Sequence, residues 1–193
     1  MQQSRASTDD QHALKDVVRL GAVWGVIGAL VMAMYAMVAA GTYQGTGFFT
    51  PTYHIASAVI EPGPMEQSMQ HAMRNDNFFF DFGPAMTGMM VHLAVGIGYG
   101  IIFALGAHAL RLRGAVSLLA GMTYGVVVML FSAFVGLPLA ASIFGGGDPI
   151  STMPAMVGWT TFTIEHLMFG GVLGIGHWLA HREGVEGRVP QVA

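Results

Sequence analysis

The chain has 193 residues, of which 53% are hydrophobic and only 10% are charged. This composition is typical of membrane proteins and carries less charge than a soluble domain does. The net charge of -3 forms no basic face, which argues against a nucleic-acid partner, and the absence of cysteine excludes disulfides, thiolate metal sites and cysteine nucleophiles.

Four apolar runs predict four membrane-spanning helices, at residues 20–41, 85–110, 115–140 and 158–180. Each run is close to the about 20 residues that a spanning helix needs. Glu165 is the only formally charged residue within them, and the runs are continuous rather than alternating, which favours helices over strands. The sequence therefore predicts a single all-α membrane domain over residues 1–193, a four-helix bundle whose first span is a retained anchor rather than a cleaved leader.

The basic residues predict the orientation of this bundle, because arginine and lysine near helix ends stay on the cytoplasmic side. Arg74 alone falls in the other set of loops. The residues on the predicted cytoplasmic side are Arg5, Lys15, Arg19, Arg111, Arg113, Arg182 and Arg188. Both termini are therefore predicted to be cytoplasmic. The short turn at 111–114 predicts that the second and third spans are antiparallel, so the second and fourth run parallel.

The outer loop, residues 42–84, is too long for a simple connection and contains signals of short helices. Thr50-Pro51 can begin one helix that runs through Ile60, and Pro64 can begin another that runs through Arg74. We expect this loop to form a cap over the outer ends of the spans.

Each predicted span also carries a pair of glycines four residues apart, which places small residues on one helix face. These pairs are Gly21 with Gly25, Gly96 with Gly100, Gly121 with Gly125, and Gly170 with Gly174. Because burial gives helices little drive to associate in lipid, close contact at glycines must supply much of the attraction between them. The pairs predict a compact bundle.

Polar side chains fall at one depth in all four spans. They are Tyr35, His92, Ser132, Glu165 and His166, with Tyr99 on the same helix face as His92. Ionisable groups in hydrocarbon are costly and usually face the bundle interior or a water-filled cavity. Glu165 is rotated by about 100° from His166 on its helix, so we expect it to bond to Ser132 or Tyr35, and one shared site is not assured.

Three interpretations of this polar layer remain open. The groups could simply hydrogen-bond between helices and fix their register. They could line an outward-facing cavity that binds or passes a small ligand or a proton. His92 and His166, on parallel helices at matched depth, could also supply the two axial ligands of one haem.

The outer loop offers a second candidate metal site. Met65, Met69 and Met73 recur every four residues with His71 among them, and thioethers suit Cu(I). The same spacing also arises when a helix packs flexible apolar methionines against the bundle, which is the favoured interpretation. No catalytic motif accompanies either site, so a non-enzymatic role is favoured.

The chain resembles the YagU-like bacterial inner-membrane proteins and similar short four-helix membrane proteins of actinobacteria. The resemblance rests on the early anchor, the long outer loop, His92 to Tyr99, the link Leu112-Arg113-Gly114-Ala115 and Glu165-His166-Leu167. It implies a multi-pass protein of the bacterial plasma membrane and supplies no catalytic residues. A structural role in a homo-oligomer or with other subunits of a membrane complex is the remaining alternative.

Overall fold

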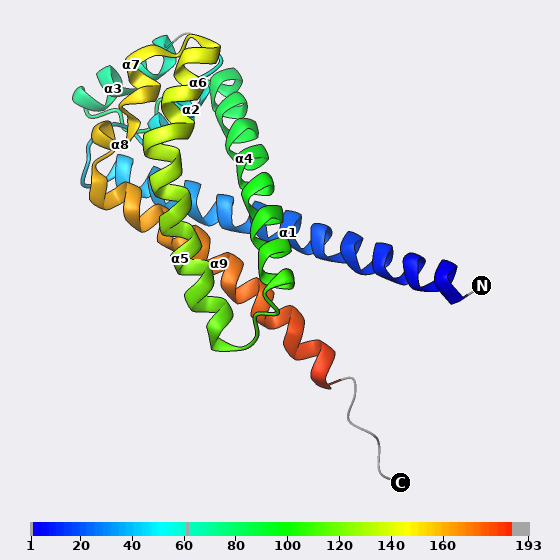
Figure 1. Ribbon diagram of the computed structural model, residues 1–193. Coiled ribbons are helices and arrows are strands. Elements are labelled where there is room, and N and C mark those ends of the chain that lie inside the picture. Colours follow the sequence, from blue (N-terminus) through cyan, green and yellow to red (C-terminus); the bar gives the residue numbers. More distant parts are fainter. Residues whose placement is uncertain (1, 61, 187–193) are drawn as a thin grey trace.

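The computed structural model describes residues 2–60 and 62–186, and within these the chain is entirely helical (Figure 1). The elements in chain order are α1 Gln2–Gly41, α2 Thr50–Ala56, α3 Gly63–Met73, α4 Phe82–Ala109, α5 Ala115–Phe131, a π-helical segment Ser132–Gly136, α6 Leu137–Phe144, α7 Gly147–Ser151, α8 Met153–Met156 and α9 Trp159–Glu186. The predicted cytoplasmic Arg188 lies outside the described residues.

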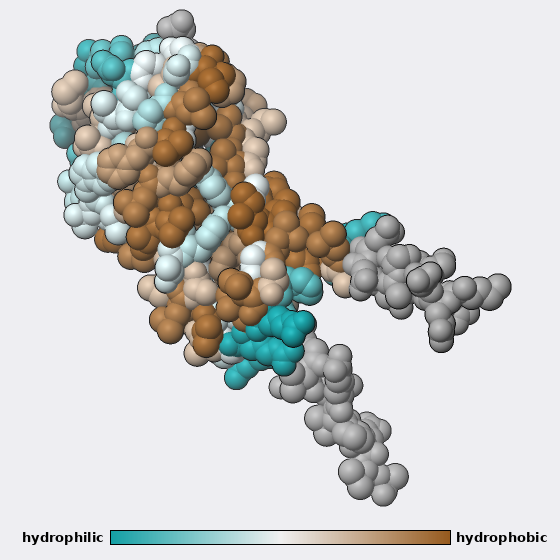
Figure 2. Space-filling view, viewed as in Figure 1, coloured by the Kyte–Doolittle hydropathy of each residue, from teal (hydrophilic) through white to brown (hydrophobic). Residues whose placement is uncertain are grey.

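Three of the described segments are long and apolar enough to cross a membrane: Ala13–Gly41, Phe82–Ala109 and Ala115–Phe144. They confirm the all-helical class and correspond to the first three predicted spans. The fourth predicted span lies in α9, which is 28 residues long but carries Glu165, His166 and His177. These three polar residues reduce its hydropathy. Figure 2 shows hydrophobic surface along the long helices and hydrophilic surface at the cap and near the end of α9.

The long helices pack in the order α4, α1, α9, α5, each against the next. In α1 and α4, Gly21 lies against Gly100, and Gly25 lies against Gly96. A Cβ added at Gly21, Gly25 or Gly100 would overlap backbone of the opposite helix, and a Cβ added at Gly96 would overlap the Cβ of Ala29. Because residue numbers rise along α1 as they fall along α4, the two helices are antiparallel.

The same contact recurs between α5 and α9. Gly121 lies against Gly170 and Gly174, and Gly125 lies against Gly170 and the carbonyl of His166. All four glycine pairs therefore lie at close contacts between helices, as the sequence predicted. A third contact, between α1 and α9, is made by larger side chains: Phe169 packs on Gly28, and Trp24 packs on Gly176. All three pairs are antiparallel, so α4 and α9 run parallel, as predicted.

Helices α4 and α5 are joined by a tight turn but contact each other far less than α4 contacts α1 or α5 contacts α9. Partway along the two helices, the hydroxyl of Tyr124 donates a hydrogen bond to the carbonyl of Tyr99 at 2.9 Å, and the ring centroids of Tyr124 and Phe103 are 5.3 Å apart. We call the end of the molecule with this turn the hairpin end and the opposite end, with α2, α3, α7 and α8, the cap end.

A π-helical turn at Ser132–Gly136 separates α5 from α6. The amide of Leu137 donates to the carbonyl of Ser132, five residues back, instead of to the residue four back. Pro138 follows directly; its ring lacks an N–H and would clash with the carbonyl four residues earlier in a regular helix. Widening the turn relieves that conflict. Such π-turns occur frequently at functional sites.

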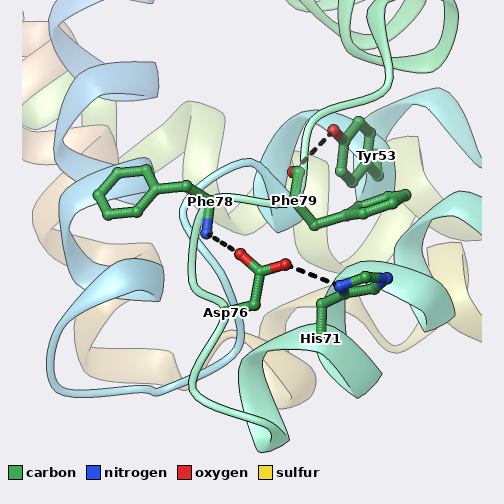
Figure 3. Close-up of polar contacts among 5 residues, drawn as sticks. All are labelled: Tyr53, His71, Asp76, Phe78 and Phe79. Carbon is green, nitrogen blue, oxygen red and sulfur yellow. Dashed lines mark hydrogen bonds and ion pairs between the residues drawn. The ribbon is translucent and has the colours of Figure 1, made fainter.

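The cap contains both predicted short helices, α2 and α3, although α2 ends at Ala56 rather than Ile60. Tyr53 joins α2 to the segment that leads into α4, because its hydroxyl donates to the carbonyl of Phe79 at 3.2 Å (Figure 3). The same hydroxyl accepts from the amide of Asp81 at 2.8 Å. Burial raises the pKa of Tyr53, which keeps the hydroxyl protonated for this role. Helices α7 and α8, after the glycine-rich segment, were not predicted.

Candidate ligand cavity

A cavity of about 290 Å³ lies in the half of the bundle nearer the cap. Its walls come from α1, α4, α9 and the α5–α6 unit, and α2 and α7 close it at the cap end. The π-turn contributes directly, since Ser132 and Gly136 both face the cavity. Val95 of α4 also lines it yet is 51% exposed, and α4 and α5 contact each other little, so we infer that the mouth lies between these two helices.

The structure brings five of the six predicted pocket residues into the lining of this one cavity. They are His92, Tyr99, Ser132, Glu165 and His166. Tyr35 is not among the lining residues; its hydroxyl is 3.4 Å from that of Tyr43, which in turn is 2.9 Å from Thr161. Glu165 and His166 are adjacent in α9, and both still reach the same space, which answers the question of a shared site that the sequence left open.

Each of the histidines His92 and His166 makes a hydrogen bond from one ring nitrogen to a backbone carbonyl. His92 Nε2 is 3.0 Å from the carbonyl of Ala29 in α1, and His166 Nδ1 is 2.7 Å from the carbonyl of Phe162 in its own helix. A carbonyl can only accept, so each of these nitrogens carries the proton and the other nitrogen of a neutral ring is left as an acceptor. The bond to Ala29 joins two helices and so fits the register-fixing interpretation for His92.

Glu165 differs from the histidines because no hydrogen bond or ion pair joins its side chain to residues 13–60 or 62–182, whose side chains the structure describes. We expected a bond to Ser132 or Tyr35, and the structure contains neither. The residue is only 6% exposed and faces the cavity. A carboxyl group in such surroundings is costly unless it gains a partner. Its position favours interaction with something that enters the cavity.

The cavity is closed toward the hairpin end by packed apolar side chains. Phe103 and Ala107 of α4 form one cluster with Phe169 and Leu173 of α9, and all four are buried. Beyond this cluster His177 Nε2 is 3.2 Å from the carbonyl of Leu112 in the turn. The polar groups on the two sides of the cluster are thus separated by hydrocarbon.

Sequence reasoning missed His54 of α2, which also faces the cavity and is 3% exposed. Its Nε2 is 2.6 Å from the carbonyl of Pro149, so it joins α2 to α7. Burial lowers the pKa of His54, which favours the neutral ring that this bond uses. Gly88 of α4 allows this cap helix to approach, because a Cβ there would overlap the carbonyl of Thr52. The length of the outer loop predicted a cap over the spans, but it did not predict which residues of that cap face the cavity.

The two predicted metal sites have different surroundings. For haem, His92 and His166 do line one cavity, each with one ring nitrogen free of a partner among the described residues. For copper, Met65 is buried against Tyr53 and Ala85, whereas Met73 is 77% exposed.

His71 is also engaged within the cap (Figure 3). Its Nδ1 is 2.8 Å from Asp76 Oδ2, and its ring stacks on Phe79 with 4.4 Å between centroids. In the part of the chain that the structure describes, no three histidine, aspartate or glutamate side chains are grouped so that they could hold a metal ion.

Comparisons with known proteins give no relative from which a role for these residues could be transferred. No protein-family model, curated protein or solved structure matches the chain. The resemblance to YagU-like proteins therefore stays a prediction, and the function has to be argued from the cavity itself.

Proposed function

We propose that this chain is a four-span protein of the bacterial plasma membrane whose outward-facing cavity binds a small ligand. In this proposal α9 is the fourth span and both termini are cytoplasmic. The distribution of basic residues supports that orientation, since Arg111 and Arg113 lie at the hairpin end and Arg74 lies in the cap. The cap end then faces outward, and the mouth between α4 and α5 opens within the outer half of the bilayer.

One observation carries the proposal: Glu165 is buried without a partner in the wall of a cavity that all four long helices build. Packing alone gives no reason for such a group, because helix contacts at glycines do not need it. Ionisable residues in membrane helices mark ligand, ion or proton sites by default. The cavity volume is at the lower end of the roughly 300–1,000 Å³ found for ligand sites. A small ligand is therefore the appropriate occupant.

Binding is favoured over passage across the membrane because the cavity closes toward the hairpin end. A pathway for a proton or polar solute needs polar groups or water along its length. The cluster of Phe103, Ala107, Phe169 and Leu173 interrupts any such route in the described helices. In this proposal the mouth beside Val95 opens on the cap side of the cluster, as a receptor or carrier site would in its outward-open state.

Single cysteines test both parts of this proposal, because the natural chain has none. For orientation, we expect a membrane-impermeant maleimide added outside intact cells to label Met73→Cys in the cap and not Arg113→Cys in the turn. In inverted membrane vesicles the pattern should reverse. The opposite pattern in both preparations would contradict the outward-facing assignment.

The cavity itself is tested with N-ethylmaleimide, which is small and uncharged. Ser132 faces the cavity, whereas Ala133, its neighbour in the π-turn, is buried at 6% exposure outside it. We expect Ser132→Cys to react in folded protein and Ala133→Cys to remain unmodified until the protein is unfolded. Equal protection of both positions would show that the cavity is not open to small molecules.

A further inference from the structure

We infer that the ligand of this cavity is a protonated amine attached to an apolar body, with Glu165 as its counter-ion. The inference rests on the proposed function and adds the chemical class of the ligand. It depends on three features of the lining: the polar groups mainly accept hydrogen bonds, no cationic side chain accompanies them, and the remaining surface is apolar.

The first feature is the excess of acceptors. Glu165 offers carboxyl oxygens, and the nitrogens opposite the protonated ones in His92, His166 and His54 offer a lone pair each. Protonating those rings instead would add charge to a mostly apolar space, which is unfavourable. The hydroxyls of Tyr99 and Ser132 add donor capacity, as does the carboxyl group of Glu165 while it is protonated, and an amine removes that last donor by taking the proton. An ammonium group has three donors and no acceptor, so it complements this arrangement.

The second feature is charge. Glu165 is the only carboxylate in the lining, neither lysine nor arginine occurs there, and the three histidines are neutral in the hydrogen bonds that they make. An anionic ligand would meet no cation and would face the carboxyl group directly. A cationic ligand would pair with Glu165 and remove the cost of leaving it alone in a region of low dielectric constant. The aromatic rings of Tyr99, Phe162 and Phe169 also line the cavity, and aromatic faces attract cations.

The third feature is the apolar remainder of the wall. Small aliphatic side chains of α1, α4 and α6 form most of it, including Ala33, Val91 and Ala140. The mouth beside Val95 lies between two apolar helices, so a hydrocarbon chain can extend from the cavity toward lipid. The ammonium could belong to a free amphiphilic amine or to the headgroup of an aminolipid. The lining has no cation for a phosphate, which favours the free amine.

The test compares three eight-carbon probes that differ only in their head group: octylamine, octan-1-ol and octanoate. Binding is measured by calorimetry at neutral pH to the full-length protein in phosphatidylcholine nanodiscs, with empty nanodiscs as the partitioning blank. We expect octylamine to bind best and octanoate least. Glu165→Gln should lower the affinity for octylamine by about tenfold or more, which corresponds to the loss of one charge-assisted hydrogen bond. Glu66→Gln, the same change at an exposed site in α3, should leave binding unchanged.

The outcomes separate this inference from the proposed function. If octylamine and octan-1-ol bind equally and Glu165→Gln alters neither, the amine inference is wrong while the cavity remains a ligand site. If none of the three binds beyond the blank, both are wrong. Adding phosphatidylethanolamine to the nanodiscs distinguishes the sources. Competition with octylamine would identify an aminolipid ammonium as the occupant, and unchanged affinity would support the free amine.

Discussion

Replacing Gly170 with leucine is expected to prevent α5 and α9 from packing, while the same change at the next residue, Gly171, is expected to be tolerated. A Cβ at Gly170 would overlap the backbone of Gly121, which cannot move aside as a flexible side chain could. Overpacking usually costs about 1–3 kcal/mol, and contact with backbone should place Gly170→Leu at or above the upper end. We expect a large fall in thermal stability in detergent and loss of the monodisperse folded protein.

Gly171→Leu is the matched control because a Cβ there has nothing within 4 Å. Leucine is a better helix former than glycine by about 0.5–1 kcal/mol. The melting temperature of the Gly171→Leu protein should therefore equal or slightly exceed that of the wild type. Gly100→Leu and Gly98→Leu form the same kind of pair on α4. Equal stability of Gly170→Leu and Gly171→Leu would contradict the close helix contact.

Replacing Glu165 with leucine is expected to make the ligand-free protein more stable. The residue is only 6% exposed and its carboxyl group has no protein partner, although the group keeps contact with the cavity. Replacing it with an apolar side chain should therefore raise the free energy of unfolding, by at most about 1–3 kcal/mol. His92→Leu should do the opposite, because it breaks the bond to Ala29 between two helices, a contact worth about 0.6–2 kcal/mol. Reversible unfolding in mixed detergent micelles measures both changes on the same scale.

This pair of variants decides between two interpretations of the polar layer. If the layer only fixes helix register, both substitutions remove a stabilising contact and both should lower the free energy of unfolding. If Glu165 is kept for a ligand, stability and binding change in opposite directions at that residue. A lower free energy of unfolding for Glu165→Leu than for the wild type would therefore show that Glu165 has a structural role, and it would contradict the ligand interpretation.

Much of the fold could be predicted because hydrophobic length and glycine spacing are local signals. Continuous apolar runs identified the long helices, and the spacing of Gly121 with Gly125 and of Gly170 with Gly174 identified the faces that meet. Which helices pair could not be predicted. Helices α4 and α5 are neighbours in the chain but contact each other little, because the glycines of α4 match those of α1 and the glycines of α5 match those of α9.

The site was predicted in part for a similar reason. Depth along each helix can be counted from the sequence, and it put His92, Ser132 and Glu165 at one level, where the structure has all three lining one cavity. The direction in which a side chain points around the helix axis is harder to predict where a π-turn changes the number of residues per turn. Such a turn runs from Ser132 to Gly136, just before Pro138. The inward position of His54 depends on how the cap folds back over α4 and α7, which no local pattern in the loop specifies.

The most direct test of the cavity as a ligand site is the rate at which N-ethylmaleimide modifies Ser132→Cys with and without octylamine or octan-1-ol. If small ligands bind in the cavity, a bound probe should shield the thiol and slow its modification in proportion to occupancy. Octylamine should protect the thiol at a lower concentration than octan-1-ol does. Labelling of Met73→Cys, which is exposed in the cap, should keep the same rate in every condition. Unchanged modification of Ser132→Cys at saturating probe would contradict the claim that small ligands bind in this cavity.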